Sequence, residues 1–196
     1  MQNKQKYRAF LQKHANSFKA LGWVTKKAQI DRFQELLSDL DINGQTILDA
    51  GCGFGDLVPF LKKHSKNFTY LGVDQMNEFI QIARKNHPNY KFLSHDYFGN
   101  PMPDKFDIII ASGSINSNIA NPLHYRKKAI KVMFNHAKKA VAFNMAGSFP
   151  QPQNRSSSRI YYANSLEILK YCLALTPKVI FRHHYRQKDF TVILFK

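Results

Sequence analysis

The sequence is poor in cysteine and in acidic residues, and it lacks long apolar runs. Its 196 residues include two cysteines, Cys52 and Cys172, and no Cys-x-x-Cys pair or Cys/His cluster with the spacing of a metal site. A disulfide framework is therefore excluded, and a reducing cytosol is the expected compartment. The first ten residues, MQNKQKYRAF, lack the apolar stretch of a secretory signal, and no uncharged run reaches the roughly 18 residues of a membrane span.

Acidic residues number 13 against 29 lysines and arginines, which gives a formal net charge of +16. Such an excess attracts polyanions, anionic membrane surfaces or acidic small molecules, although lysines also simply keep a protein soluble. Hydrophobic residues make up 44% of the chain, so a packed core is expected and a disordered chain is not. The length predicts one domain, because single domains commonly have about 100–200 residues.

The chain is expected to open with two amphipathic helices, over 5–21 and over 28–40, where apolar residues recur three, four and seven positions apart. The Asn43-Gly44 pair then ends the second helix. We predict an N-terminal helical cap over 1–44 and a core over 45–196, within one folding domain.

From Thr46 onward, strand and helix patterns alternate. Short apolar runs rich in β-branched or aromatic residues predict strands at 46–51, 68–74, 90–96, 106–112, 140–145, 178–185 and 190–195. Helical spacing occurs at 55–64, 77–86, 122–137 and 164–174. Because the early strands are apolar on both faces, they suit a parallel sheet covered by helices, and the short connection between the last two runs predicts an antiparallel hairpin. The predicted fold class is therefore α/β, a three-layer sandwich with a mostly parallel seven-stranded sheet that ends in this hairpin.

The stretch ILDAGCGFGDL at 47–57 carries the strongest chemical signal. Its three glycines allow a sharp turn off the strand and a close approach of the backbone to a ligand. Asp74 ends the next strand, where a carboxylate can accept hydrogen bonds from both ribose hydroxyls. Asp56 stands where a dinucleotide fingerprint would require glycine, and no phosphate loop of the G-x-x-x-x-G-K type is present. A nucleoside ligand other than NAD or a nucleoside triphosphate is indicated.

LDAGCGFG, followed by GVD at the second strand, resembles motif I and the next acidic motif of class I S-adenosylmethionine-dependent methyltransferases, which have a Rossmann-like fold. The resemblance covers 46–145, and the closing hairpin also fits it. More narrowly, LGW at 21–23, RF at 32–33, AFN at 142–144 and DFTVILF at 189–195 resemble small bacterial proteins similar to trans-aconitate methyltransferase.

The resemblance implies S-adenosylmethionine as cofactor and assigns roles to individual residues. Gly51 and Gly53 are expected under its methionine part, Asp49 near its ammonium group, and Asp74 at the ribose. The adenine would be packed by Met76 and would donate to Asp96. The complete set implied for the cofactor site is Trp23, Arg32, Asp49, Gly51, Cys52, Gly53, Asp74, Gln75, Met76, Asp96, Tyr97 and Ser112.

Each assignment has a structural alternative. The glycines can serve only a tight turn, Asp74 can be the N-cap of the helix at 77–86, and Asp96 can be a turn residue before Gly99. Trp23 can be a buried anchor of the N-terminal helices, and Arg32 can be a surface cation. Cys52 suits packing better than nucleophilic attack.

An S-adenosylmethionine-dependent reaction is a direct in-line displacement in which alignment matters most, so a base is optional. A carboxylate or imidazole acceptor needs none, whereas a hydroxyl or a protonated amine would need one, with His95 and His124 among the candidates. The catalytic residues are not identified; weak candidates are His183, His184 and Tyr185, which lead into the last turn.

The acceptor pocket is expected at the carboxyl ends of the strands. Its predicted walls are the N-terminal helices, SGSINSN at 112–118, and the loop at 147–162, which supplies Arg155, Arg159, Tyr161 and Tyr162. This set of cations and aromatic rings suits a planar or anionic small molecule. The first hypothesis is therefore a methyltransferase acting on a small-molecule acceptor, with no membrane partner.

A nucleic-acid methyltransferase is the alternative, because Lys127, Lys131 and Lys138 are predicted to share one helical face. Against it, the chain has neither the Asn/Asp-Pro-Pro-aromatic pattern nor the Pro-Cys pair that resemble base methylation. A third hypothesis is a protein that binds the cofactor without catalysis.

Overall fold

A computed structural model describes residues 2–15 and 17–196 of the chain. Its helices are α1 (Gln2–His14), α2 (Lys26–Leu37), α3 (Val58–His64), α4 (Asn77–Asn86), α5 (Pro122–His136) and α6 (Ser165–Leu173). Its strands are β1 (Gln45–Ala50), β2 (Phe68–Asp74), β3 (Lys91–Ser94), β4 (Phe106–Ser112), β5 (Ala137–Ser148), β6 (Ala163–Asn164), β7 (Val179–Arg182) and β8 (Asp189–Phe195). Among the described residues, no helix combines the length and the apolar character needed to cross a membrane.

The strands form one sheet in the order β3-β2-β1-β4-β5-β8-β7, with the short β6 paired to the end of β5. Strands β3, β2, β1, β4 and β5 pair in parallel, and β8 lies antiparallel between β5 and β7. The predicted α/β class, the mostly parallel sheet and the terminal hairpin are confirmed. The seven expected strands are all present, and β6 adds an eighth.

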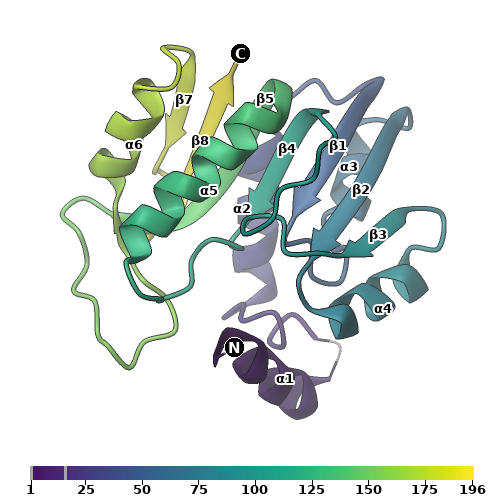
Figure 1. The fold of residues 1–196 in the computed structure, drawn as a ribbon, viewed down its shortest axis with the longest axis horizontal. Coiled ribbons are helices and arrows are strands. Elements are labelled where there is room, and N and C mark those ends of the chain that lie inside the picture. Colours follow the sequence, from purple (N-terminus) through teal and green to yellow (C-terminus); the bar gives the residue numbers. More distant parts are fainter. Residues whose placement is uncertain (1, 16) are drawn as a thin grey trace.

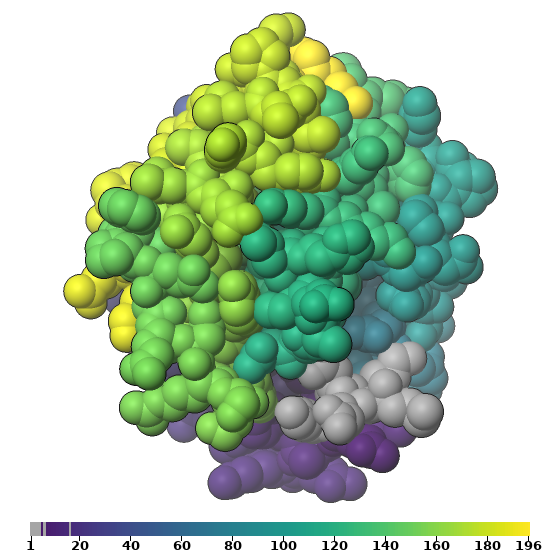
Figure 2. Space-filling view, turned by 60° about the vertical axis from the view of Figure 1, so that its left-hand side comes forward, coloured from purple at the N-terminus to yellow at the C-terminus, as the bar shows by residue number. Residues whose placement is uncertain are grey.

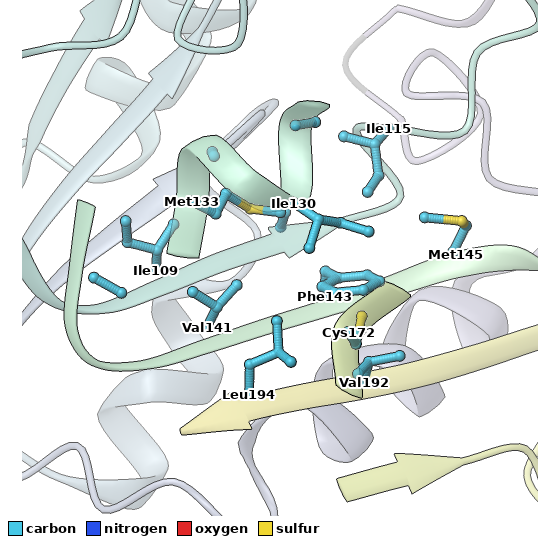
Figure 3. Packing of buried hydrophobic residues seen from close by; sticks show 14 of the residues in the cluster. Ile109, Ile115, Ile130, Met133, Val141, Phe143, Met145, Cys172, Val192 and Leu194 are labelled. Carbon is cyan, nitrogen blue, oxygen red and sulfur yellow. The ribbon is translucent and has the colours of Figure 1, made fainter. Parts of the chain in front are cut away.

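Helices cover both faces of the sheet. In Figure 1, α5 and α6 lie in front of the sheet and α2 and α3 lie behind it. On the α5 face, Ile130 and Met133 point toward Val141 and Phe143 of β5 (Figure 3), within a large cluster of fully buried side chains. A second buried cluster on the opposite face joins residues of α2, α3 and α4 to β1 and β4. The two cores hold the sheet rigidly, so the strand ends are fixed in position.

The N-terminal segment differs from its prediction. The helix expected over 5–21 ends at His14, because Ala15 adopts a left-handed conformation (φ 47°) that a right-handed helix cannot continue. Residues 17–22 form turns instead, and Asn16 lies outside the described residues. The next helix begins where Thr25 caps it by accepting from the amide of Ala28, and it ends at Leu37.

Other predicted boundaries also differ, and one element was missed. The second helix spans Lys26–Leu37 and not 28–40, so the prediction that the Asn43-Gly44 pair ends it is wrong. The helix expected over 122–137 ends at His136, and β5 begins at Ala137, so the chain passes from helix to strand without a loop. The strand β6 has two residues and pairs with Gly147 and Ser148, beyond the part of β5 that was predicted. Both features depend on sheet pairing and not on a local apolar pattern.

Candidate cofactor and substrate site

A cavity of about 620 Å³ opens at the carboxyl ends of the parallel strands. Residues that follow β1, β2, β3 and β4 line it, together with the segment around Trp23 and the turn between β7 and β8. In Figure 1, the arrowheads of β1, β2 and β4 point toward the end of the molecule where α1 lies. This is the edge of the sheet at which the sequence predicted ligand binding.

The glycine-rich bend after β1 forms one wall of the cavity. Gly51, Gly53 and Gly55 have φ values of 84°, 55° and 77°, which residues with a side chain rarely adopt. A Cβ atom on Gly51 would lie 2.2 Å from the Cβ of Ser114, and one on Gly53 would lie 2.8 Å from Leu21. The bend therefore requires glycine for two reasons: its backbone conformation and the close approach of neighbouring side chains.

Asp74 fixes this bend from the next strand. Its carboxylate accepts from the amide of Gly53 at 3.1 Å through one oxygen and from the amide of Met76 at 2.9 Å through the other. The N-cap of α4 is Met76 rather than Asp74, so the alternative in which Asp74 caps that helix is wrong. Asp74 lines the cavity, where its charge faces any bound ligand.

Asp49, at the end of β1, is a buried carboxyl group with 2% exposure. Burial raises its pKa to about 7; the hydroxyl of Tyr70, which donates to it at 2.8 Å, opposes that rise, and the charges of Asp74 and Asp56 add to it. Asp96 is a fourth carboxylate on this side of the cavity. Such a concentration of negative charge beside a glycine cradle fits a cationic ligand, and S-adenosylmethionine carries both a sulfonium and an ammonium group.

Arg32 and Trp23 close the cavity from α2 and the segment before it. The guanidinium carbon of Arg32 lies 4.7 Å from the centroid of the Trp23 ring, and Arg32 donates to Asp189 at 2.5 Å. With 11% of its side chain exposed, Arg32 is not a surface cation. Asp189 also accepts from Nε of Arg186 at 2.9 Å. Sequence reasoning missed Asp189 as a site residue, because its partner is 157 positions away.

The remaining predicted residues also reach the cavity. Asp96 accepts from the amide of Gly99, so it both shapes the turn and lines the cavity. Ser112, at the end of β4, accepts from Nδ2 of Asn144 at 3.2 Å. The full set of predicted cofactor residues that line the cavity is Trp23, Arg32, Asp49, Gly51, Cys52, Gly53, Asp74, Gln75, Met76, Asp96, Tyr97 and Ser112. Their individual roles stay predictions.

The weak catalytic candidates separate into two groups. Tyr185 lines the cavity, with its hydroxyl 2.9 Å from that of Thr191. His183 packs against the rings of Phe181 and Phe190, and neither it nor His184, which is 69% exposed, is among the described lining residues. His183 and His184 were candidates because they lead into the last turn. They directly follow β7, whose residues do not line the cavity, and they lie outside the lining as β7 does.

Among the other histidines, His95 alone of the described residues lines the cavity. Its Nε2 atom lies 2.6 Å from the carbonyl oxygen of Asn100, so that nitrogen donates and is not free to act as a base. His124 lies on α5, outside the cavity lining that the structure describes.

The two loops predicted as acceptor walls pack against each other. A bridge pairs Ser117 with Ile160, and the amide of Asn118 donates to the carbonyl of Arg159 at 2.8 Å. In Figure 2, residues near 120 (blue-green) and near 150 (green) come to the surface together, above the N-terminal residues (purple). From the later loop, Arg159 and Tyr162 line the cavity, whereas Arg155 and Tyr161 are not among the described lining residues.

The helical face of lysines proposed for nucleic acid is not present as predicted. Lys138 lies in β5, after the end of α5, and so cannot share a helical face with Lys127 and Lys131. Lys127 is already engaged by Glu167, at 2.9 Å.

The sheet order, the glycine bend and the carboxylate after β2 define a Rossmann-like methyltransferase fold. A protein family described as a methyltransferase domain matches residues 47–140. The crystal structure of magnesium protoporphyrin IX methyltransferase from Synechocystis PCC 6803 with bound S-adenosylhomocysteine superposes with a TM-score of 0.67 at 14% identity, covering 98% of this chain and 93% of that one. Residues 47–140 thus match a methyltransferase domain, and the fold is that of the class I S-adenosylmethionine-dependent methyltransferases. The narrower resemblance to trans-aconitate methyltransferase-like proteins stays a prediction.

Two curated proteins illustrate the range of relatives. Release factor glutamine methyltransferase from Buchnera aphidicola is 28% identical over 168 residues, which are 83% of this chain and 54% of that protein. Fatty-acid O-methyltransferase from Mycolicibacterium smegmatis is 29% identical over 84 residues, 41% of this chain and 31% of that protein. The chain thus spans about half of the first relative and about a third of the second.

Proposed function

We propose that this protein transfers a methyl group from S-adenosylmethionine to a small, anionic acceptor. The observation that carries the proposal is one cavity lined by charges of both signs. Asp56 and Asp74 lie close enough to Asp49 to raise its pKa, and Arg159, on the loop before β6, and Lys188, in the turn before β8, line the same cavity. We match a cationic cofactor to the carboxylates, and an anionic acceptor to the wall formed by the loops at 112–118 and 147–162, which we call the acceptor side.

The chain's own residues supply binding and alignment. Asp74 and Met76 would hold the nucleoside and Asp49 the ammonium group, and Ser112 lines the cavity from the end of β4. When bound, S-adenosylmethionine supplies a methyl group already activated by its sulfonium. Trp23 and Arg32 would exclude water from this region, which fits our proposal that residues 1–44 act as a cap on the core at 45–196.

A carboxylate acceptor would need no general base. His95 is the one histidine among the described lining residues, and because its Nε2 atom donates to a backbone carbonyl, Nδ1 is the nitrogen left to accept a proton. Tyr185 is paired with Thr191, and burial raises its pKa far above neutral. A carboxylate oxygen is already a nucleophile at neutral pH, so an acid is the acceptor that these residues suit best. The relative named fatty-acid O-methyltransferase supports an acidic acceptor.

Cofactor binding is tested at Asp74. We expect Asp74→Ala to weaken S-adenosylhomocysteine binding about tenfold or more in calorimetry, because hydrogen bonds to a charged group contribute roughly 1.5–3 kcal/mol each. The exposed Asp104, which is not among the described lining residues, gives the matched control Asp104→Ala. Equal cofactor affinity in Asp74→Ala and the wild type would remove Asp74 from the site.

The acceptor class is tested with a labelled methyl donor and a metabolite pool, with product masses recorded before and after ribonuclease treatment. We expect label on small acidic molecules, insensitive to ribonuclease and released by mild alkali as methyl esters are. Label on RNA would reverse the assignment in favour of the nucleic-acid alternative. Absence of S-adenosylhomocysteine production with every pool would instead favour a binding protein without catalysis.

A further inference from the structure

Arg126 of α5 is a fully buried arginine, with 0% exposure. Its terminal nitrogens donate to the carbonyl oxygens of Ser117, Pro122 and Tyr161, at distances between 2.8 and 3.4 Å. Its guanidinium carbon also lies 4.8 Å from the centre of the Tyr161 ring. No carboxylate within the described ranges pairs with it, so a positive charge is buried here without a counter-ion.

This charge lies directly behind the acceptor side of the cavity. Ser117, whose carbonyl it binds, lines the cavity, and so do the chain neighbours Tyr125, Ile160 and Tyr162. Arg126 joins the loop after β4 to the loop before β6, because Ser117 belongs to the first and Tyr161 to the second. It therefore fixes the distance between the two loops that wall the acceptor side.

Two further cations face the same side from the cavity lining. The guanidinium carbon of Arg159 lies 3.9 Å from the centre of the Phe10 ring of α1, and in the part of the chain that the structure describes its side chain makes no hydrogen bond or ion pair. Lys188 lies near the Tyr162 ring, at 5.9 Å, and also has no carboxylate partner there. By contrast, Arg32 and Arg186 both pair with Asp189, and Arg186 also lies 3.7 Å from Asp31.

The aromatic contact leaves the edge of Arg159 available. A guanidinium stacked on a ring keeps its N–H groups in the plane, where they can bind a carboxylate or phosphate through two parallel hydrogen bonds. The rings of Tyr125 and Tyr162 line the same side and can pack on a flat ligand.

We propose that this side of the cavity is an anion-binding subsite, in which Arg159 contacts the carboxylate or phosphate of a planar acceptor and Arg126 is a positioning residue that holds the two loops. Lys188 adds long-range attraction for the anion. That the bound anion is the methyl acceptor rests on the proposed function; that Arg159 binds an anion does not.

The subsite is tested by titrating benzoate, phenyl phosphate and the neutral benzamide into the full-length protein, with and without saturating S-adenosylhomocysteine. We expect at least one of the two anions to bind saturably, and we expect benzamide to bind at least about tenfold more weakly than that anion. In Arg159→Met, anion binding should fall to the benzamide level while S-adenosylhomocysteine affinity stays unchanged. Arg155→Met, in the same exposed loop but outside the described lining, is the matched control.

The two anions distinguish the source of the charge. Stronger Arg159-dependent binding of benzoate supports a carboxylate acceptor, and stronger Arg159-dependent binding of phenyl phosphate supports a phosphate-bearing one. Equal binding of benzamide and both anions, or unchanged anion binding in Arg159→Met, overturns the subsite. Failure of S-adenosylhomocysteine to bind would contradict the proposed function alone, because the anion titration without cofactor still tests Arg159.

Arg126 is tested with Arg126→Lys, which keeps the charge but replaces the two separated terminal nitrogens of the planar guanidinium by a single ammonium nitrogen, and with Lys127→Met on the same helix as control. We expect Arg126→Lys to weaken anion binding several-fold with S-adenosylhomocysteine affinity unchanged, and Lys127→Met to alter neither. If both affinities fall together, or neither changes, the positioning role is wrong. Arg159→Met then still decides the subsite itself.

Discussion

At the scale of single residues, the proposed place of Asp49 beside the cofactor predicts that cofactor binding depends on pH. Burial raises its pKa to about 7, and a cationic ligand favours its ionised form. Binding should therefore release a proton from Asp49, and affinity should rise with pH. We expect S-adenosylmethionine to bind close to tenfold more tightly at about pH 7.5 than at about pH 6, since the ionised fraction increases by roughly that factor. Calorimetry at both pH values measures the effect, and Asp49→Asn should abolish it.

The same residue predicts an opposite effect on the stability of the free protein. Because the folded-state pKa of Asp49 lies above its ordinary value of 3.8, the protonated form stabilises the fold, and that contribution is lost as pH rises from about 4 through about 7. Asp49→Asn removes the cost of burying the charge. We expect it to raise the unfolding temperature at about pH 8 and to have a smaller effect at about pH 5. An unfolding temperature lowered equally at both values would contradict the raised pKa.

Gly51 and Gly44 both have a left-handed backbone conformation, but only at Gly51 would an added Cβ atom make a close contact. Their φ values are 84° and 69°, but a Cβ atom would lie 2.2 Å from Ser114 at Gly51 and 3.9 Å from the nearest side-chain atom at Gly44. Both alanine variants carry the backbone strain. We expect Gly51→Ala to lose about 1–3 kcal/mol more unfolding free energy than Gly44→Ala, because overpacking adds to the strain. Urea denaturation of the two variants measures this difference.

At the scale of elements, one buried ion pair ties α2 to the start of β8. Arg32 and Asp189 are both nearly inaccessible, and Asp189 has a second partner in Arg186. Asp189→Asn leaves Arg32 without a counter-ion, whereas Arg32→Met leaves Asp189 with Arg186. We therefore expect Asp189→Asn to cost about 3–5 kcal/mol and Arg32→Met clearly less, as measured by chemical denaturation.

The partly exposed pair between Lys127 and Glu167 provides the control for this comparison, because solvent screens it more than the buried pair. Lys127→Met should change the unfolding free energy by about 1 kcal/mol or less. A cost for Asp189→Asn as small as that of Lys127→Met would mean that the Arg32–Asp189 pair does not hold α2 on the sheet.

Most elements could be predicted from the sequence because their apolar patterns are local. The strands β2 and β4 and the helix α4 have the bounds that the sequence indicated. The first helix was overextended because its apolar spacing continues through the break at Ala15. The strand β6 could not be found, since two residues carry no pattern and its pairing partner lies in another strand.

The candidate site was predictable where motif and strand end coincide, as at Gly51 and Asp74. The site was less predictable at residues whose side-chain direction depends on contacts far away in the sequence. The partner of Arg32 and the burial of Arg126 follow from three-dimensional packing that no spacing in the sequence records. His183 failed as a candidate for the same reason, because the strand that precedes it turns its side chain into an aromatic cluster.

At the scale of the whole molecule, the net charge of +16 and the charge inside the cavity act separately. The surface excess creates a long-range field that attracts any polyanion and is screened within about 10 Å at moderate salt. The cavity, by contrast, places Asp56 and Asp74 close enough to Asp49 to raise its pKa, despite the basic surface. Binding that depends on the surface should weaken steeply with salt, and binding inside the cavity should not.

Thermal unfolding with added ligands separates these two effects. A ligand at about 100 times its dissociation constant stabilises the folded state by roughly 2.7 kcal/mol, which is about 5–10 °C for a chain of this size. We expect S-adenosylhomocysteine to give this shift equally at about 50 mM and about 200 mM salt, and single-stranded RNA to give a smaller shift that vanishes at the higher concentration. An RNA-induced shift that persists at about 200 mM salt would identify nucleic acid as a specific partner, because non-specific binding rests essentially on counter-ion release and weakens steeply with salt.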